Sequence, residues 1–358
     1  MNNARRQQGI SVETIRRRIL SLPTLLALLV GVALFAVVVW RVFDFDWGDL
    51  WDNIRGIQVW QYMLALVLYY LSFWFRGLRW RLIALTANID NNDGKSIPGP
   101  TKMGGIILMG WFANSVAFLR LGDALRGWTL HRESKSSFPS ALGTVLAERV
   151  QDMVAVLGLV AIAAVWVTVS GDAEIPGTVL VAAIALVGAL IAGLIVMRLF
   201  GLQLSRFLPV RLRQPYERFQ SGTLDSFRGS HLPVQMSLGV AGWMLEIARF
   251  YFVAEALGID VGFGLVMFAA LANAMLTTIP TPGGFGFVEG GLTGLLVLLG
   301  LDDTSALSLT VVDRSISWLS VVLLGGLLFF AWHYFKRRSL TGEQDVPASS
   351  VDRAADTG

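Results

Sequence analysis

Long apolar runs alternate with short charged segments along most of the chain. Six runs have roughly the length that an α-helix needs to cross a bilayer: 22–40, 60–75, 141–169, 178–197, 234–257 and 307–332. Two further apolar regions, 103–119 and 262–300, are shorter or interrupted. The pattern predicts an all-α, polytopic bundle of membrane helices with about six full spans.

Prolines and glycines break the second interrupted region. Its stretch 280–291 contains two prolines, the glycines Gly283, Gly284 and Gly286, and the carboxylate of Glu289. Proline removes a backbone donor, and lipid cannot satisfy the carbonyl groups that a broken helix leaves. We therefore expect this backbone to line a protein-walled or watery cavity, with Glu289 as a candidate occupant.

Lysine and arginine mark the side of the membrane on which each connection lies. A basic excess occurs in 1–21, 76–102, 120–139, 198–233 and 333–338. The positive-inside rule places these segments in the cytoplasm. A full crossing by 103–119 would break the rule, so we expect a re-entrant hairpin there and both termini in the cytoplasm. Region 262–300 is either a second re-entrant hairpin or two full helices, which would make eight spans.

Two parts of the chain resemble each other. Five residues separate Ala141-Leu142 from Glu148-Arg149, and five separate Ala306-Leu307 from Asp313-Arg314. The charge argument runs the two segments in opposite directions across the membrane. Inverted repeats with broken helices are typical of secondary transporters, whose substrate lies at the repeat interface. We therefore favour two re-entrant or broken-helix hairpins.

Composition supports the membrane class and divides the chain. Of 358 residues, 54% are hydrophobic and 15% charged, and the mean hydropathy is +0.60. We predict a basic N-terminal segment (1–20), an integral membrane domain (21–338) and a disordered tail (339–358), with 22–40 a retained span rather than a cleaved signal peptide. Within the domain, 198–233 is too basic to cross; it is either a helix on the anionic leaflet or a linker packed on the bundle.

Charged residues within the apolar runs are the strongest candidates for a functional site. They are Glu148, Arg149, Asp152, Asp313 and Arg314, together with Glu246 and Arg249. A charge at the bilayer centre costs about 2.5–3.5 kcal/mol on insertion scales, so these groups should pair or face a cavity. Adjacent helical residues point about 100° apart, so each acidic-Arg pair should reach to other elements. Glu246 and Arg249 fit a structural i,i+3 ion pair.

Arginines also cluster at the ends of two apolar runs. Arg120, Asp123 and Arg126 fall near one helical stripe; they form either a phosphate-binding fork, with close approach at Gly122, or an interfacial charge cluster. The cluster 76–81 follows an aromatic run and fits an interfacial anchor.

Signatures of enzymes are absent from the sequence. The chain has no cysteine, its three histidines lack metal-ligand spacing, and the glycine-rich stretch is not a P-loop. We expect no enzymatic activity, no metal or cofactor, and no nucleic-acid partner.

Several motifs in order resemble a known family. They are the segment 120–126 (Arg-Leu-Gly-Asp-Ala-Leu-Arg), the segment 148–152 (Glu-Arg-Val-Gln-Asp), and the segment 282–290 with its glycines and Glu289. Together they resemble the lysylphosphatidylglycerol synthase transmembrane-region family of flippase-like proteins. The resemblance implies a cell-membrane protein that translocates a modified phospholipid, here without the soluble aminoacyl-transferase domain of the full-length synthases.

We therefore expect a transporter or flippase-like protein for a phospholipid or lipid-linked headgroup. Arg120 and Arg126 would bind phosphate, Glu289, Glu148 and Asp313 would complement amines or take up protons, and Arg149 and Arg314 would balance charge. The alternative is a non-transporting accessory or scaffold protein that binds a lipid-modifying enzyme. An intramembrane enzyme acting on a lipid-linked sugar is a third hypothesis.

Overall fold

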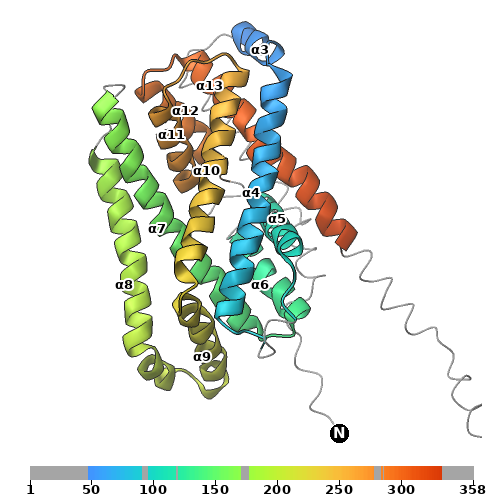
Figure 1. Cartoon of the computed structure of the whole chain (residues 1–358), viewed down its shortest axis with the longest axis vertical. Coiled ribbons are helices and arrows are strands. Elements are labelled where there is room, and N and C mark those ends of the chain that lie inside the picture. The colour runs from blue at the N-terminus through green and yellow to red at the C-terminus, as the bar shows by residue number, and fades with distance from the viewer. Residues whose placement is uncertain are drawn as a thin grey trace, which may run out of the picture.

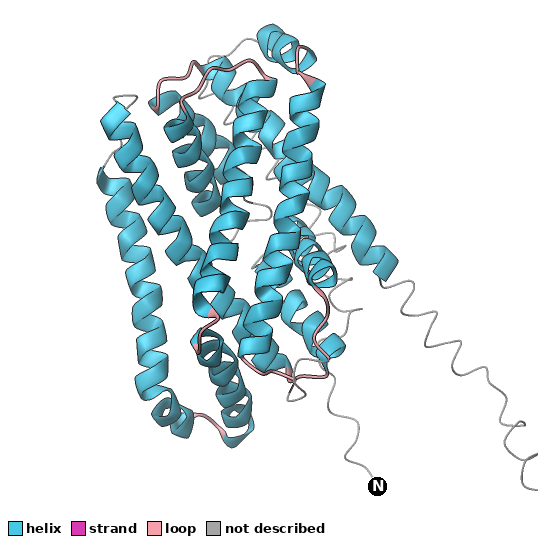
Figure 2. Ribbon diagram, viewed as in Figure 1, coloured by secondary structure: helices cyan, strands magenta, loops and turns pink. Residues whose placement is uncertain are grey.

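The regular structure of the chain is helical throughout the part that the structure describes. The computed structural model describes residues 47–90, 96–117, 120–170, 177–277, 284 and 286–332, and no strand occurs within them (Figure 2). The predicted all-α class is confirmed. The N-terminal segment 1–20, the first expected span 22–40 and the tail 339–358 lie outside the described residues.

Long helices form the frame of the bundle (Figure 1). They are α4 (Val59–Thr86), α7 (Phe138–Ser170), α8 (Gly177–Phe207) and α10 (Leu232–Ala256). A further long helix starts as α13 (Asp303–Arg314), continues as the π-helix η4 (Ser315–Gly325) and ends at Trp332.

Six full spans were predicted, and the structure supports this count in part. Within the described residues, three helices combine the length and the apolar character of a span: Phe138–Val167, Leu232–Ala256 and Asp303–Trp332. Helices α4 and α8, with 28 and 31 residues, have sufficient length for a crossing. Aromatic and polar residues lower the hydropathy of α4. Its buried face includes Arg76 and Arg79.

Two pairs of shorter helices lie between the long ones. Helices α5 (Pro100–Val116) and α6 (Leu121–Ser134) occupy the lower half of the bundle in Figure 1, whereas α11 (Phe263–Leu276) and α12 (Phe287–Leu298) occupy the upper half. The helices of each pair contact each other. A 14-residue helix such as α6 or α11 is about 21 Å long, less than the roughly 30 Å hydrocarbon core.

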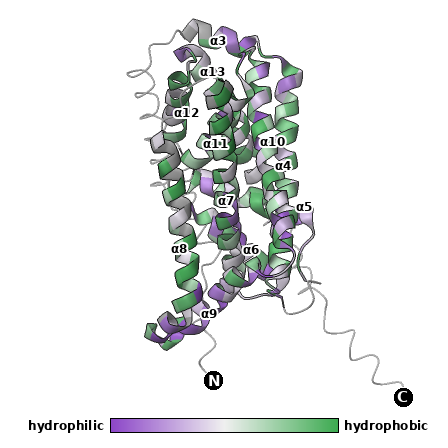
Figure 3. Ribbon diagram, turned by 60° about the vertical axis from the view of Figure 1, so that its left-hand side comes forward, coloured by the Kyte–Doolittle hydropathy of each residue, from purple (hydrophilic) through white to green (hydrophobic). Residues whose placement is uncertain are grey.

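The outer surface of the bundle is apolar, as a membrane protein requires. Ile162, Val165 and Val169 project outward from α7, with 57%, 64% and 82% of their surfaces exposed. Ala163 and Val167, on the opposite side of the same helix, are fully buried. Hydrophobic residues predominate along the long helices in Figure 3, whereas hydrophilic residues gather on α9. Lipid therefore meets hydrocarbon, and the charged residues face inward.

The basic segment 198–233 is largely helical and packs on the bundle. Helix α9 (Val210–Leu224) is followed by the short 3-10 helix η2 (Asp225–Phe227). Helix α9 rests on α7 at Gly143 and Gly222, where a Cβ would meet the facing backbone.

At the opposite end of the molecule (Figure 1), α3 (Trp47–Arg55) packs on α13 through Leu50 and Leu307.

Glycine permits the closest approach between the two helices of the lower pair. A Cβ on Gly122 of α6 would overlap the carbonyl oxygen of Gly110 of α5. The amide N–H of Gly122 also donates to Asn114 Oδ1, at 2.8 Å. Gly122 therefore allows α5 and α6 to pack closely. The sequence had instead suggested that it would allow a phosphate group to approach.

We predict that Gly122→Ala destabilises the fold, because the methyl group forces α5 and α6 apart; overpacking of this kind costs about 1–3 kcal/mol. The matched control is Gly158→Ala in α7, where a Cβ meets nothing within 4 Å and alanine favours the helix. Thermal unfolding in detergent should show a lower midpoint for Gly122→Ala alone. Equal midpoints in the two variants would contradict the close contact.

Candidate functional site

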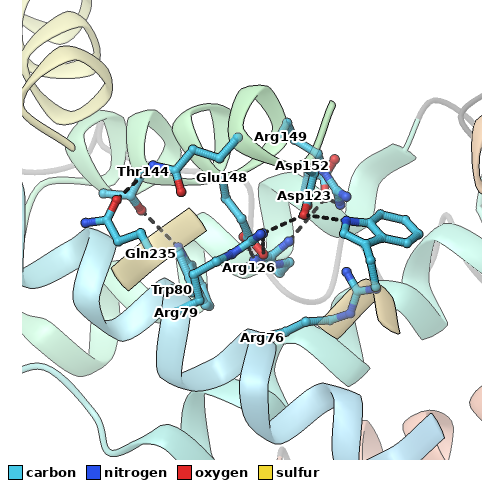
Figure 4. Close-up of polar contacts among 12 residues, drawn as sticks. Arg76, Arg79, Trp80, Asp123, Arg126, Thr144, Glu148, Arg149, Asp152 and Gln235 are labelled. Carbon is cyan, nitrogen blue, oxygen red and sulfur yellow. Dashed lines mark hydrogen bonds and ion pairs between the residues drawn. The ribbon is translucent and has the colours of Figure 1, made fainter. Parts of the chain in front are cut away.

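A cluster of buried ion pairs joins α4, α6 and α7 (Figure 4). Glu148 of α7 accepts at both of its oxygens: Arg79 Nη2 lies 3.3 Å from Oε1, and Arg126 Nη2 is bonded to Oε2. Arg79 also lies 2.8 Å from Asp152 Oδ1. We call Arg79, Arg126, Glu148 and Asp152 the Glu148 cluster. Each of its four side chains is at most 4% exposed, so the pairs are shielded from water.

Neighbouring aromatic and polar groups complete the Glu148 cluster. The guanidinium of Arg126 stacks over the ring of Trp80, 4.4 Å from its centroid. The indole N–H of Trp80 donates to Thr144 at 3.1 Å, and that of Trp243 donates to Asp152 at 3.2 Å. These contacts hold both charged and aromatic side chains in one orientation.

A more exposed pair lies beside this cluster. Arg149 Nη2 donates to Asp123 Oδ1 at 2.7 Å, and the two side chains are 23% and 22% exposed. Arg120 and Arg126 lie 3.8 and 3.9 Å from Asp123. Asp123 therefore binds α6 to α7 and stands between three arginines. Arg120 itself adopts a left-handed backbone with φ of 50°, at the junction between α5 and α6.

A second buried cluster joins α4, α10 and α13. Glu246 accepts from Arg76 at 3.3 Å and from Arg249 at 3.1 Å, one at each oxygen. Arg249 also pairs with Asp313, which is fully buried. We call Arg76, Glu246, Arg249 and Asp313 the Glu246 cluster. The guanidinium of Arg76 lies between two indole rings, 5.1 Å from Trp111 and 4.8 Å from Trp243.

The upper helix pair is attached to α13 by its own ion pair. Arg314 Nε donates to Glu289 Oε1 at 2.7 Å. The second oxygen of Glu289 accepts from the amide N–H of Gly286, which has φ of 82°, at 2.8 Å. Glu289 thus caps the start of α12 and bonds Arg314 at the same time. A π-helix, a form frequent at functional sites, begins directly after Arg314.

A cavity of about 160 Å³ lies among these clusters and between the two short helix pairs. Five arginines line it: Arg76, Arg120, Arg149, Arg249 and Arg314. Asp152 and Glu246 are the carboxylates of the lining, and Tyr69, Trp111, Trp243 and Trp318 are its rings. The lining includes Asn273 of α11 and Ser115 of α5, so both short pairs contribute. Arginines thus outnumber carboxylates in the lining itself, while Asp123, Asp313 and Glu289 behind it pair with three of them. The guanidinium N–H groups that these pairs leave over suit an anionic group.

The structure brings together most of the site residues that the sequence indicated. Glu148 and Arg149 reach Arg126 and Asp123 on α6, and Asp313 and Arg314 reach Arg249 and Glu289. The expectation that each acidic-Arg pair contacts other elements is confirmed. Gly284, with φ of 74°, lines the cavity, whereas Gly283 lies outside the described residues.

Two expectations about arginines need correction. Arg76 and Arg79 were predicted to anchor α4 at the interface, but they are 5% and 1% exposed and belong to the two buried clusters. Arg126 was expected to bind phosphate, but it is 1% exposed, engaged by Glu148 and Trp80, and absent from the cavity lining.

Sequence reasoning also underestimated Glu246 and Arg249. The predicted i,i+3 pair is present at 3.1 Å, but the same residues connect three helices and line the cavity. The spacing of Tyr69, Phe73, Arg76 and Trp80 along one face of α4 was the available signal for this buried stripe.

We predict that Glu148→Gln strongly destabilises the protein, because it leaves Arg79 and Arg126 buried without their anion; breaking a buried pair costs about 3–5 kcal/mol. Glu133→Gln is the matched control, since Glu133 pairs with Lys102, which is 46% exposed, and such pairs contribute about 0–1 kcal/mol. Thermal unfolding in detergent measures both. A Glu148→Gln midpoint no lower than that of the control would contradict the assigned role.

Comparison with known proteins places this architecture in a family. Residues 27–325 match the family described as the lysylphosphatidylglycerol synthase TM region. A "UPF0104 membrane protein" of Methanocaldococcus jannaschii is 31% identical over 229 residues, covering 61% of this chain and 93% of that protein. Another, from Pyrococcus horikoshii, is 24% identical and covers 85% of this chain and 95% of its own length.

A third relative carries an enzyme's name. It is described as glycosyltransferase AglD of Haloferax volcanii, is 22% identical over 74% of this chain, and is matched over 47% of its own length. No solved structure matches the chain. The resemblance expected from the motifs is confirmed: the chain belongs to the lysylphosphatidylglycerol synthase transmembrane-region family and is a multi-pass membrane protein.

Proposed function

We propose that the protein moves the head of a phospholipid or lipid-linked phosphate across the cell membrane through the arginine-lined cavity. The observation that carries the proposal is the lining itself, in which five arginines and two carboxylates surround about 160 Å³. A cation-rich, partly enclosed space offers a phosphate the charge-assisted hydrogen bonds that hydrocarbon lacks. The acyl chains would remain among the apolar outer faces of the helices.

The two short helix pairs supply a route for movement in this proposal. We interpret α5–α6 and α11–α12 as re-entrant hairpins that enter from opposite sides of the membrane and meet at the cavity. Their lengths and their positions in opposite halves of Figure 1 support this interpretation. Each pair precedes a long helix that carries an acidic-Arg dipeptide, Glu148-Arg149 or Asp313-Arg314. Inverted repeats of this kind permit alternating access around a central site.

The charge distribution supports one orientation. Helix α9, with three arginines at one end of the bundle, would lie at the cytoplasmic face, and α3, with Asp49 and Asp52, at the outer face. Both termini would then be cytoplasmic.

The individual arginines would have different roles. Arg120 and Arg149 line the cavity and are 31% and 23% exposed, so they are the proposed phosphate ligands. Arg126 and Arg79 would hold α4, α6 and α7 together through Glu148. The glycines Gly284 and Gly286, both with positive φ, would permit the upper pair to move relative to α13.

The second candidate is an accessory protein that binds a lipid- or envelope-modifying enzyme without moving lipid. The relative described as a glycosyltransferase favours it, because the match covers 47% of a protein whose name is that of an enzyme. The two functions differ in a direct readout: the purified protein moves lipid in the first and does not in the second.

We predict that Arg120→Gln slows movement of a headgroup-labelled phospholipid in reconstituted vesicles by about tenfold, because one charge-assisted hydrogen bond to the phosphate is lost. Glutamine removes the charge and the guanidinium but keeps the three-carbon stem and a polar end. Arg132→Gln on the same helix is the control, since Arg132 is exposed and lies against Trp128. Equal rates in the two variants would contradict the site, and a wild-type protein that moves no lipid would favour the accessory role.

A further inference from the structure

The cavity is unsuited to a headgroup that carries an ammonium. We propose that its ligand is an anionic phosphate head without an amine, such as a phosphomonoester or a phosphodiester bearing hydroxyl groups. The inference rests on the proposed function, because it specifies the headgroup that the cavity accepts.

The two carboxylates that line the cavity are already paired with arginines. Glu246 accepts from Arg76 at one oxygen and from Arg249 at the other, at 3.3 and 3.1 Å. Asp152 Oδ1 accepts from Arg79 at 2.8 Å and from the indole of Trp243 at 3.2 Å. An ammonium entering the cavity would have to displace one of these arginines from a carboxylate.

The carboxylates behind the lining are occupied in the same way. Glu148 is bonded to Arg79 and Arg126, one at each oxygen. Glu289 accepts from Arg314 and from the amide of Gly286. Asp313 is bonded to Arg249, and its second oxygen accepts from Ser317 at 3.3 Å. The sequence had suggested that Glu289, Glu148 and Asp313 would complement amines, but every oxygen of these three groups has a donor.

The aromatic faces that attract ammonium groups are covered by arginine. The rings of Trp111 and Trp243 lie against the guanidinium of Arg76, and that of Tyr69 lies 5.4 Å from the guanidinium carbon of Arg249. Cation–π recognition of an amine or a quaternary ammonium needs open ring faces. Every carboxylate of the lining is therefore already paired with arginine, and each of its rings already has a guanidinium nearby.

Donors, in contrast, are in excess. Within the described residues, the Nε groups of Arg76 and Arg149 are buried and have no hydrogen-bond partner. Asn273 Oδ1 is likewise buried without a donor, on a side chain that is 5% exposed and lines the cavity. Phosphate oxygens complement the guanidinium groups that line the cavity, and a hydroxyl group complements the amide of Asn273. The cavity volume of about 160 Å³ is well above the roughly 10–15 Å³ that a single water needs, which leaves room for a compact headgroup.

The test compares headgroups on the purified full-length chain in neutral detergent. Dissociation constants would be measured for dihexanoyl forms of phosphatidic acid, phosphatidylglycerol and phosphatidylethanolamine, and for inorganic phosphate. We expect phosphatidic acid or phosphatidylglycerol to bind about tenfold more tightly than phosphatidylethanolamine. Binding of phosphatidylethanolamine as tight as that of both anionic lipids overturns the inference. Binding of inorganic phosphate alone keeps the anion chemistry but overturns the lipid as its source.

A charge variant localises the preference to the cavity. Asn273→Asp adds a carboxylate to the lining, and we expect it to weaken binding of the anionic lipids about tenfold and to reduce their advantage over phosphatidylethanolamine. Gln214→Glu makes the same change in net charge on the exposed surface of α9 and should leave the ratio unchanged. An unchanged ratio in Asn273→Asp would overturn the assignment; if that variant does not fold, the wild-type comparison decides.

The two proposals fail in different ways. A protein that prefers anionic heads but moves no lipid in vesicles contradicts the transport function alone. A protein that moves lipid but binds an ammonium-bearing head equally well contradicts the headgroup assignment alone.

Discussion

Hydrocarbon cannot solvate charge, and the arrangement of this protein follows from that constraint. Its interior contains arginines and carboxylates that would be prohibitively costly on a lipid-facing surface. The structure resolves the conflict by pairing them across helices, so that Glu148 connects α4, α6 and α7 and Glu246 connects α4 and α10. These ion pairs connect helices and also cancel the charges of the side chains that form them. Removal of one partner would affect several helices together.

The same pairing leaves a defined space. Because the carboxylates are consumed by the buried arginines, the more exposed arginines Arg120 and Arg149 share Asp123 between them. Two of the short helices begin at residues with positive φ: α6 starts after Arg120, and α12 starts after Gly286. The structural ion pairs and the candidate ligand site are therefore parts of one network. The buried clusters are balanced, and the excess positive charge lies where Arg120 and Arg149 share Asp123.

Much of this arrangement was accessible from the sequence. The lengths of the apolar runs predicted α7 and α10 closely, because an uninterrupted run has no competing explanation in a membrane protein. The adjacency of Glu148 and Arg149 predicted bonds to other elements, since neighbouring helical residues point in different directions. The family resemblance came from the same short motifs.

The remainder depended on packing that a linear pattern does not contain. Arg76 and Arg79 follow an aromatic run, which is typical of an interfacial anchor. They are buried instead because α4 continues to Thr86 and packs tightly on α5, where Gly77 faces Gly104 and Pro100. The pairing of Arg249 with Asp313 joins residues 64 positions apart, and no local spacing indicates it.

The central claim is that a water-accessible cavity lies within the bundle among these ion pairs. The chain has no cysteine, so a single Ala274→Cys on the lining and a single Ile162→Cys on the outer face of α7, which is 57% exposed, can be compared directly. In intact vesicles, a water-soluble, membrane-impermeant maleimide should label Ala274→Cys and leave Ile162→Cys unlabelled, because thiolates form in water and not in lipid. Labelling of Ile162→Cys with no labelling of Ala274→Cys would contradict the account.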